Sequence, residues 1–383
     1  MSKSLSNFVR WIPAILTGLL ALEYFSLGSA WITLLALALF ALYSAFSPKQ
    51  GLIGQIQLPR DDGFLDTQDV QWWYWTGHLE TEEGRRFGFE VVFFAFRNFG
   101  LFWDQLAQGA ITDVEGNQFH FSEYVHFGLQ SHPKNAFNLK AGPGDVLRAA
   151  GGGGKDHLHS EIDGFVLDLD LEQTKKPVMH YCGGPHPYYF GGYTYYYSRV
   201  NMATSGTLTF GGKTYKVSGS SWFDRQYGDL LEAITQGWQW FAIELDDNRQ
   251  IMIYDLLGKG SGVERAGSIT NADGHTRNLT GNDFKIEQLG KWQSPQTGCI
   301  YPMGWRVSVA GLTLTVEPMV VDQELCAEHD LWIGPEYWEG ACSVGGDVSG
   351  KAYVELNGFC RGPEGTIDFR KTAGQAKSQK AGN

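Results

Sequence analysis

The sequence is short of charged side chains, and those it has are mostly acidic. Charged residues make up 19% of the 383 positions, and 30 Lys and Arg stand against 42 Asp and Glu, for a formal net charge of −12. A protein that binds nucleic acid needs a basic surface to neutralise phosphates. The charge balance therefore excludes nucleic acid as an expected partner.

Cysteine is also scarce, and its spacing fits no known metal-binding pattern. There are five cysteines, an odd number, and no C-x-x-C pair occurs among them. A chain of this length can build a hydrophobic core without disulfides. We expect mostly buried thiols, with neither a zinc site nor a disulfide framework, at Cys182, Cys299, Cys326, Cys342 and Cys360.

Several familiar catalytic signatures are missing from the chain. It contains no G-x-S-x-G nucleophile elbow, no P-loop, no H-E-x-x-H motif and no dinucleotide-binding fingerprint. These absences argue against an α/β hydrolase, a nucleoside triphosphatase, a zinc peptidase and a Rossmann oxidoreductase.

Charge is almost absent from the N-terminal segment. Between Trp11 and Phe46 the only charged residue is Glu23, and the 24 residues from Tyr24 to Ser47 are all uncharged. At about 1.5 Å per residue, one helix of that length spans a hydrocarbon core of about 30 Å. We therefore expect residues 1–50 to anchor the chain in the cell membrane, as one span or as a helical hairpin.

A cleaved signal peptide is the alternative interpretation of this segment. Lys3 and Arg10 form a basic start, and Gly28-Ser29-Ala30 resembles a cleavage site, but cleavage there leaves a second apolar run on the mature protein. The basic residues before the segment nearly balance Lys49 and Arg60 after it. The positive-inside rule therefore leaves the side of the membrane open.

After Pro48 the sequence changes to short alternating runs separated by turn residues, with no long stretch of helical period. Residues 165–171 (FVLDLDL) place three leucines on one face and two aspartates on the other. Two further stretches, 208–217 and 307–316, predict hairpins that turn at Gly211-Gly212 and Ala310-Gly311. Repeated hairpins with one apolar face indicate an all-β barrel or sandwich.

A weak internal echo indicates two such units. Trp73-Tyr74-Trp75 and Trp238-Gln239-Trp240 each lead through a polar turn into a second apolar strand. Any two half-buried hairpins look alike, so chance similarity is the alternative. We expect a first domain at 51–232, a second at 233–370 and a disordered tail at 371–383, where small polar residues dominate.

One histidine pair invites a metal-site interpretation. His157 and His159 would share a strand face with Glu161, because side chains alternate along a strand. The pair follows a glycine run and a Lys-Asp pair. A solvated strand edge is therefore the preferred interpretation, and no metal is expected.

The most informative stretch is residues 220–228 (SSWFDRQYG). On a strand, Trp222, Asp224 and Gln226 share one face, while Phe223 and Arg225 share the other. On the inner face of a barrel, Asp224 would be desolvated, which raises its pKa and suits it to act as a general acid. The alternative is that Asp224 begins a turn or pairs with Arg225 at the surface.

Aromatic residues crowd the strand just before this stretch. Tyr193, Tyr195 and Tyr197 would share one face, and aromatic faces can stabilise a carbocation, although such residues are more often plain core. Glu339 and Glu355 are carboxyl groups set among apolar residues. They are candidates for a functional role or for structural hydrogen-bond acceptors.

Together these segments resemble the AttH family, whose members are often labelled secreted hydrolases and which is related to the bacterial carotenoid 1,2-hydratases (hydroxyneurosporene synthases). The resemblance runs in order from about residue 65 to 362. It rests on six motifs, which are Trp72–Leu79, Tyr195–Arg199, Gly206–Leu208, Gly219–Gly228, Tyr337–Gly340 and Tyr353–Gly358.

The resemblance implies two lipocalin-like (calycin) antiparallel β-barrels and a lipophilic substrate. In the hydratases an aromatic-x-Asp strand carries the acid that protonates a C=C bond, and this motif falls on Trp222 and Asp224. A His-x-aromatic strand that assists it falls on Tyr195 and Tyr197, so tyrosine stands where the hydratases have histidine. Because a tyrosine with a pKa near 10 is a poorer base toward water, carotenoid hydration itself is placed in doubt. The hydrolase label has no nucleophile motif to support it here.

The sequence therefore predicts a membrane-tethered, hydratase-like hydro-lyase that protonates a C=C bond of a carotenoid-like or isoprenoid-like lipid, without a cofactor. A non-catalytic lipid carrier and a lipocalin-like cyclase or isomerase are the alternatives. The expected partners are a hydrophobic small molecule and the membrane. The expected catalytic residues are Asp224 and Tyr195, and the expected substrate-binding residues are Trp222, Tyr197, Tyr193, Trp73 and Trp75.

Overall fold

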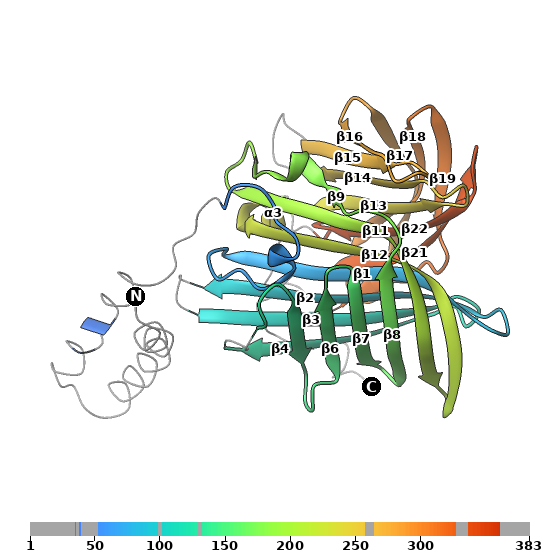
Figure 1. Ribbon diagram of the computed structural model, residues 1–383. Coiled ribbons are helices and arrows are strands. Elements are labelled where there is room, and N and C mark those ends of the chain that lie inside the picture. Colours follow the sequence, from blue (N-terminus) through green and yellow to red (C-terminus); the bar gives the residue numbers. More distant parts are fainter. Residues whose placement is uncertain are drawn as a thin grey trace.

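The computed structural model describes residues 35, 38–39, 53–98, 102–128, 132–256, 264–326 and 336–360. They form two antiparallel sheets, which lie one above the other in Figure 1. The expected all-β architecture with two barrel-like sheets is confirmed. The expected membrane segment, apart from three residues, and the expected disordered tail lie outside the described residues. Within the described part, no helix is long and apolar enough to cross a membrane.

The first sheet has twelve strands in the order β4-β3-β2-β1-β12-β11-β8-β7-β6-β5, with β9 and β10 paired to β11. Its strands are β1 (Val70–Thr81), β2 (Arg86–Asn98), β3 (Phe102–Asp113), β4 (Gln118–Phe127), β5 (Phe137–Ala141), β6 (Leu147–Gly152), β7 (Lys155–Ile162), β8 (Phe165–Gln173), β9 (Val178–Met179), β10 (His186–Pro187), β11 (Tyr193–Phe210) and β12 (Lys213–Asp229). Two short 3-10 helices, η2 (Arg60–Asp62) and η3 (His180–Gly183), accompany it.

The second sheet has ten strands in the order β16-β15-β14-β13-β22-β21-β19-β18-β17, with β20 paired to β21. The short helix α3 (Leu231–Gln236) leads into it from β12. Its strands are β13 (Trp238–Leu245), β14 (Gln250–Leu256), β15 (Glu264–Thr270), β16 (Thr276–Thr280), β17 (Phe284–Gln293), β18 (Ile300–Val309), β19 (Leu312–Pro318), β20 (Glu324–Leu325), β21 (Tyr337–Gly346) and β22 (Gly350–Asn357).

Each sheet pairs its first strand with its last. β1 lies between β2 and β12, and β13 lies between β14 and β22. The first sheet also curls, so that β3 and β4 contact β5 and β7 from its other end. Each curled sheet encloses its own hydrophobic core, because alternate side chains of every strand point inward.

The two hairpin turns expected from the sequence are present. Gly211 and Gly212 have φ values of 56° and 76° and join β11 to β12, with Phe210 opposite Lys213. Ala310 and Gly311, with φ values of 50° and 79°, join β18 to β19 in the same way. Two successive residues of positive φ are what a two-residue hairpin loop requires. The leucine face of β8 is also buried as expected.

The Trp-x-Trp motifs of β1 and β13, by contrast, do not occupy equivalent positions in the two sheets. The β1–β2 and β13–β14 turns are built alike, since Thr81 bonds to Arg85 and Leu245 to Arg249 through the same backbone groups. Trp73 and Trp238 are one residue further apart than Thr81 and Leu245. One residue reverses the face on a strand. Trp73 and Trp75 of β1 therefore point into the first core, whereas Trp238 and Trp240 of β13 point outward toward the first sheet.

The outer faces of the two sheets pack against each other and form a third buried cluster. It combines residues of β1, β2, β11 and β12 with residues of β13, β14, β21 and β22. Gly88 of β2 marks how closely the sheets approach, because a Cβ atom placed there would lie 2.5 Å from the Cβ of Ala341. This interface, rather than a barrel interior, holds the site described below.

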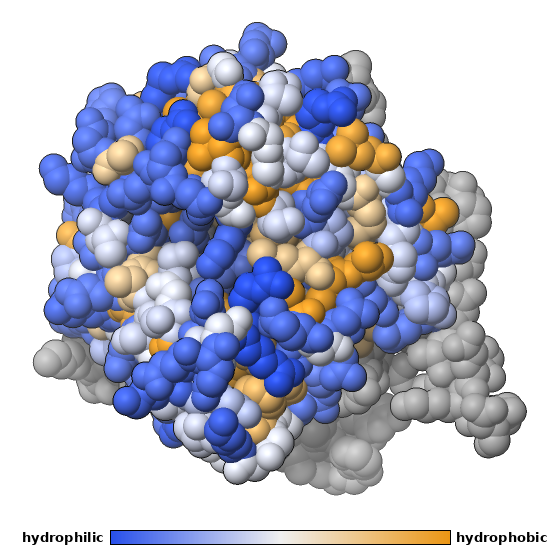
Figure 2. Space-filling model, turned by 90° about the vertical axis from the view of Figure 1, so that its right-hand side faces the viewer, coloured by the Kyte–Doolittle hydropathy of each residue, from blue (hydrophilic) through white to orange (hydrophobic). Residues whose placement is uncertain are grey.

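The molecular surface shows few large apolar side chains. The face in Figure 2 is mostly hydrophilic, with hydrophobic residues in small separate groups. Among the described residues, the large hydrophobic side chains that are exposed are Leu35, Tyr189, Leu231, Leu289, Ile300 and Val321. Most of the apolar side chains of the described residues therefore lie inside the two sheets or between them.

Candidate active site

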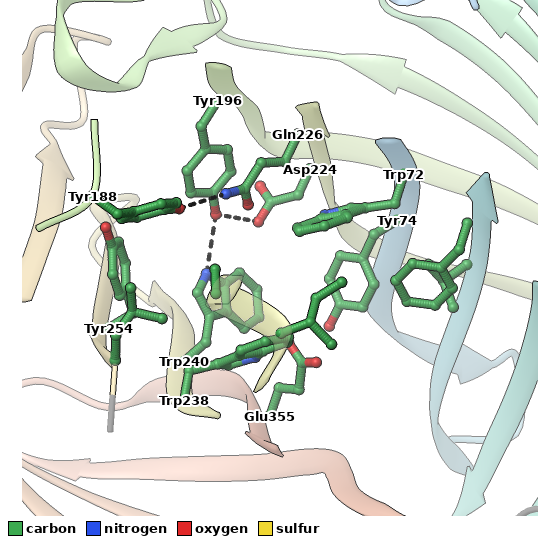
Figure 3. Close-up of a pocket in the computed structure, with 15 residues that line it drawn as sticks. Trp72, Tyr74, Tyr188, Tyr196, Asp224, Gln226, Trp238, Trp240, Tyr254 and Glu355 are labelled. Carbon is green, nitrogen blue, oxygen red and sulfur yellow. Dashed lines mark hydrogen bonds between the residues drawn. The ribbon is translucent and has the colours of Figure 1, made fainter. Parts of the chain in front are cut away.

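A pocket lies in the interface between the two sheets (Figure 3). Its cavity volume is about 70 Å³, and about 670 Å³ of space is empty when its opening to solvent is included. Apolar and aromatic side chains form most of the wall, and two carboxyl groups, from Asp224 and Glu355, interrupt it. The other lining residues are Trp72, Tyr74, Val92, Phe94, Tyr188, Tyr196, Gln226, Ala233, Ile234, Trp238, Trp240, Tyr254 and Leu256.

Strand β12 places Asp224 in this pocket through simple alternation. Trp222, Asp224 and Gln226 face the second sheet, whereas Phe223 belongs to the core of the first sheet and Arg225 lies over the ring of Trp73 on that same side, 3.8 Å from its centroid. The shared face expected from the sequence is therefore confirmed. The expected inner face of a barrel is wrong, because Asp224 lies on the outer face and is desolvated by the second sheet.

The Asp224 carboxylate accepts three hydrogen bonds from neighbouring side chains. Its Oδ1 accepts from Ser198 Oγ at 2.5 Å and from Trp222 Nε1 at 2.7 Å, and its Oδ2 accepts from the Tyr196 hydroxyl. Only 4% of the residue is exposed. Burial raises the pKa of Asp224 to about 6, while the three donors pull it back toward the ionised form.

His180 of η3 extends this network behind Ser198. Its Nε2 lies 2.7 Å from Ser198 Oγ. Because the serine proton points to Asp224, the histidine Nε2–H is the donor of this second bond. Burial lowers the pKa of His180 to about 3, so the ring is neutral. His180 thus donates to Ser198, and Ser198 donates to the Asp224 carboxylate.

Tyr196 and Trp240 complete the ring of polar contacts in the pocket. The Tyr196 hydroxyl donates to Asp224 and accepts from Trp240 Nε1 at 3.1 Å, so one phenol joins the first sheet to the second (Figure 3). Gln226 is held in turn by the hydroxyls of Thr194 and Tyr188, at 2.8 and 3.2 Å.

Of the residues expected to accompany Asp224, the structure brings only Trp222 to its side. Trp73 and Trp75 lie in the first core, where their indole nitrogens donate to Asp62 and Asp156. Trp73 and Trp75 therefore lie on the face of β1 that points away from the pocket.

The three expected tyrosines of β11 also lie away from the pocket. The Tyr195 hydroxyl accepts from the Ile53 backbone N–H at 2.8 Å, the Tyr197 hydroxyl donates to Asp62, and the Tyr193 hydroxyl donates to Gln68 at 3.1 Å. Strand alternation gives the reason, since Tyr196 and Ser198 occupy the opposite face of β11. The β11–β12 register, with Ser198 opposite Asp224, is the signal that selects them.

Asp62 and Arg199 form a separate buried pair in the first barrel. Arg199 donates to Asp62 at 2.6 Å, and both side chains are almost fully buried, at 1% and 0% exposure. Asp62 also accepts from the Gly153 backbone N–H at 2.7 Å. This network holds η2 against β11, which gives Tyr197 and Arg199 a structural role.

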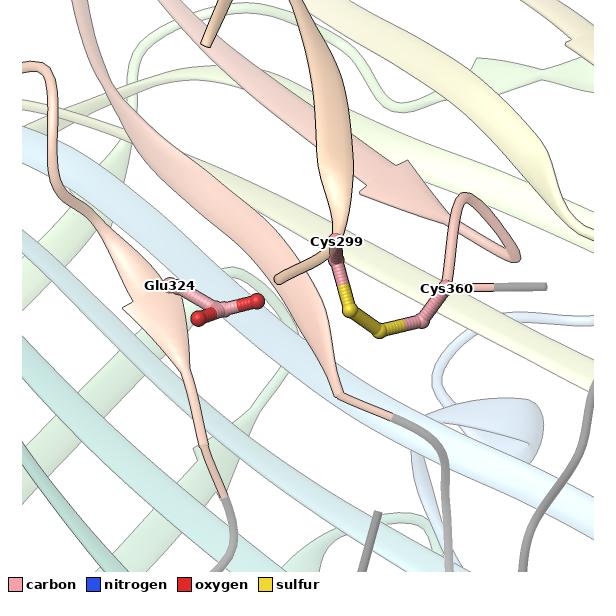
Figure 4. Close-up of side chains that lie close together, drawn as sticks. All are labelled: Cys299, Glu324 and Cys360. Carbon is pink, nitrogen blue, oxygen red and sulfur yellow. A yellow bond between two sulfur atoms is a disulfide. The ribbon is translucent and has the colours of Figure 1, made fainter. Parts of the chain in front are cut away.

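The cysteine expectation is wrong for most of the five. Cys299 and Cys360 form a disulfide, Cys182 is exposed and Cys326 is partly exposed, whereas Cys342 is a buried thiol. The disulfide joins two segments that only the fold brings together (Figure 4).

Among the described residues, Cys299, Glu324 and Cys360 are the one group whose positions would suit a metal ion. Their chemistry does not fit, since disulfide sulfurs are not thiolates and Glu324 already accepts from Ser294, Thr297 and Tyr301. His157 and His159 lie on the outer face of β7 and pair with Asp168 and Asp170 of β8. The pair is solvated as preferred, but β7 lies between β6 and β8 and is not an edge strand.

Comparisons with known proteins agree with this architecture. A family model described as AttH-like matches residues 50–359. A search of curated protein sequences finds no match. A crystal structure from Nitrosomonas europaea assigned to AttH superposes with a TM-score of 0.71 and 26% identity, covering 80% of this chain and 97% of that one.

Kievitone hydratase from Nectria haematococca shares the fold at lower similarity. Its crystal structure superposes with a TM-score of 0.63 and 19% identity, covering 82% of this chain and 97% of that chain. The lipocalin-like two-sheet fold is thus common to all three proteins. On the family match over most of its length, the chain belongs to the AttH-like family.

Proposed function

We propose that the protein adds water to a C=C bond of an apolar substrate bound in the pocket between the two sheets, with Asp224 as an essential proton-transfer group. The observation that carries this proposal is a buried carboxyl group of raised pKa in an aromatic-lined pocket. A group titrating near neutral pH is suited to general acid–base catalysis. The fold shared with kievitone hydratase, a hydratase by name, supports the reaction class.

The lining also suits a cationic intermediate. Protonation of an alkene leaves a carbocation, which the faces of Trp and Tyr rings stabilise through their quadrupoles. Three tryptophans and four tyrosines line the pocket around Asp224 and Glu355. No organic cofactor or metal is required by this chemistry.

The size of the pocket limits how much of a substrate it takes. A cavity of about 70 Å³ is smaller than the several hundred Å³ of a typical ligand site. It has room for a branched alkene end group and a water molecule, since a water needs roughly 10–15 Å³ of such volume. The substrate class that fits is therefore a lipid with an isoprenoid-like end, whose remainder lies along the opening.

The apolar segment 11–46 fits the same function. As a membrane anchor it would hold the pocket close to the bilayer, where a water-insoluble substrate is concentrated. The test is fractionation of the full-length chain, which should remain in the membrane pellet after an alkaline wash. Release of the intact chain by that wash would refute the anchor.

The decisive experiment follows labelled water. Purified protein is incubated with acyclic carotenoids and terpenoids in 18O-labelled water, and the masses of the products are measured by mass spectrometry. A gain of one labelled water supports hydration. Stoichiometric retention of unchanged lipid supports the carrier alternative, and an isomer of unchanged mass supports a cyclase or isomerase.

The matched variants are Asp224→Asn and Asp170→Asn. Asp224→Asn should lower turnover by about 100-fold or more while lipid binding persists. Asp170 is an exposed carboxylate on β8 that pairs with His157, so its variant should behave like the natural protein. Equal turnover in both variants would remove Asp224 from the reaction.

A further inference from the structure

A second set of carboxyl groups lies beside the pocket, on the side opposite Asp224. Glu90 of β2 and Glu339 of β21 are 0% and 1% exposed. Glu355 of β22 is partly exposed and lies opposite Glu339 in the β21–β22 ladder. Of these three, Glu355 lines the pocket. Figure 3 shows its carboxyl group and that of Asp224 on opposite sides of the pocket.

These three carboxyl groups cannot all be ionised. The charged groups that act on them are one another and Asp224, and both oxygens of Glu90 have no hydrogen-bond partner. Uncompensated charges in a buried site are so costly that protons are retained instead. Burial and the neighbouring carboxyl groups raise the pKa of Glu355 to about 7 and raise those of Glu90 and Glu339 well above their usual value.

The other titratable groups around this cluster do not supply a counter-charge. The hydroxyls of Tyr74, Tyr337 and Tyr353 come from β1, β21 and β22, and burial together with the carboxyl groups raises the pKa of each well above its usual value. They are neutral phenols at physiological pH. The cluster therefore keeps protonated carboxyl groups at neutral pH, and of the three only Glu355 lines the pocket.

Asp224 is held in the opposite state. Three donors aim at its two oxygens, and each of these bonds is best satisfied by the carboxylate. Glu355, by contrast, has one side-chain donor, from Trp238. The two sides of the pocket therefore differ in protonation. The surroundings of Asp224 favour a carboxylate, and those of Glu355 favour a protonated carboxyl group.

We propose that Glu355 is the proton donor of the hydration and that Asp224 is the carboxylate that takes the proton from the attacking water. This assignment rests on the function proposed above. The second sheet supplies the proton donor, and the first sheet supplies the proton acceptor. It differs from the sequence expectation, in which Asp224 is the donor.

The step balances without a further reactant. The Glu355 O–H bond breaks and a C–H bond forms at one alkene carbon, which leaves a carbocation at the other. A water molecule forms the new C–O bond from the opposite side of the alkene and releases its proton to Asp224. One proton has then moved from Glu355 to Asp224, and exchange with water in the pocket restores the starting state.

The test is the pH profile of turnover in the full-length protein and its variants. The natural protein should show a bell between an acid limb near pH 6, from Asp224, and an alkaline limb near pH 7, from Glu355. Glu355→Gln should lose at least about 100-fold in rate and keep only the acid limb. Asp224→Asn should keep only the alkaline limb. A Glu355→Gln profile that retains the alkaline limb overturns the assignment.

One control variant and a comparison of the two site variants separate the role of Glu355 from the proposed function. Glu317→Gln changes an exposed carboxyl group on β19 of the same sheet and should leave rate and profile unchanged. If Asp224→Asn loses turnover while Glu355→Gln keeps it, the hydratase stands and the role of Glu355 falls.

A readout without turnover tests the protonation state itself. Infrared difference spectra of Glu355→Gln against the natural protein at pH 6 should show the loss of one protonated carboxyl band. Loss of an ionised carboxylate band at that pH would overturn the proposal, whatever substrate the protein uses.

Discussion

The Tyr74 hydroxyl donates a hydrogen bond to Glu339, which joins β1 of the first sheet to β21 of the second. Both side chains are buried, with exposures of 6% and 1%. Tyr74 also lies opposite Asp224 in the β1–β12 ladder and lines the pocket. One phenol therefore couples the packing of the two sheets to the spacing of the two carboxyl groups.

Replacing Tyr74 by Phe should weaken this interface. The change leaves a buried Glu339 without its donor, which costs about 1–3 kcal/mol of unfolding free energy. Urea denaturation followed by tryptophan fluorescence measures the effect. Tyr215→Phe is the matched control, because Tyr215 stacks on Phe210 at the β11–β12 turn, far from the interface. Equal stability of the two variants would show that the bond contributes nothing.

The proton on Asp224 should make stability depend on pH. Because burial raises the pKa of Asp224 from 3.8 to about 6, the folded protein binds this proton more tightly than the unfolded chain does. The resulting stabilisation is complete below pH 4 and is lost as the pH rises through 6. The difference in unfolding free energy between the natural protein and Asp224→Asn should therefore fall by about 2 kcal/mol between pH 4 and pH 7.

Urea denaturation of both proteins at several pH values gives this difference directly. The buried His78 and His180, whose pKa values are lowered to about 3, contribute with the opposite sign. They are present in both proteins, so their contributions cancel in the comparison. A difference that stays constant with pH would mean that Asp224 titrates alike in the folded and unfolded chains.

Ser198 should act as a positioning residue for Asp224. Its hydroxyl favours the carboxylate form, so Ser198→Ala should raise the pKa of Asp224 and move the acid limb of the turnover profile to higher pH. The rate at neutral pH should fall by about tenfold or more, the usual worth of a hydrogen bond to a charged group. Ser205→Ala, on the exposed face of the same strand, is the control. A purely structural role would lower the rate without moving the limb.

The sequence predicted the strand face that carries Asp224 but missed most of the residues around it, for a physical reason. Alternation along β12 suffices to group Trp222, Asp224 and Gln226 on one face. Which tyrosines of β11 join them depends on the cross-strand register, and the family motif directed attention to Tyr195 and Tyr197 instead of Tyr196 and Ser198. Strand period alone cannot choose between two aromatic faces.

The position of the pocket was beyond the reach of sequence patterns as well. A barrel interior is the usual ligand site of a closed sheet, so Asp224 was expected there. In this fold the interior is filled by Trp73, Trp75 and the rest of the first core. In the sequence, Glu355 is recognisable as a carboxyl group among apolar residues. Sequence patterns could not place Glu355 across a pocket from Asp224, because the two residues lie on different sheets and only the packing of the sheets brings them together.

The Cys299–Cys360 disulfide should stabilise the end of the strand that carries Glu355. It connects the start of β18 to the residues just after β22 and closes a loop of 61 residues. Loss of a disulfide that closes a loop of this length typically costs about 2–5 kcal/mol. Cys360→Ser should therefore unfold at lower urea concentration than the natural protein, and a reducing agent should bring the natural protein to the same midpoint. Cys182→Ser removes an exposed free thiol and should change nothing. If the reducing agent leaves the midpoint of the natural protein unchanged, the two cysteines are thiols in solution, and β22 is held by its ladders to β13 and β21 alone.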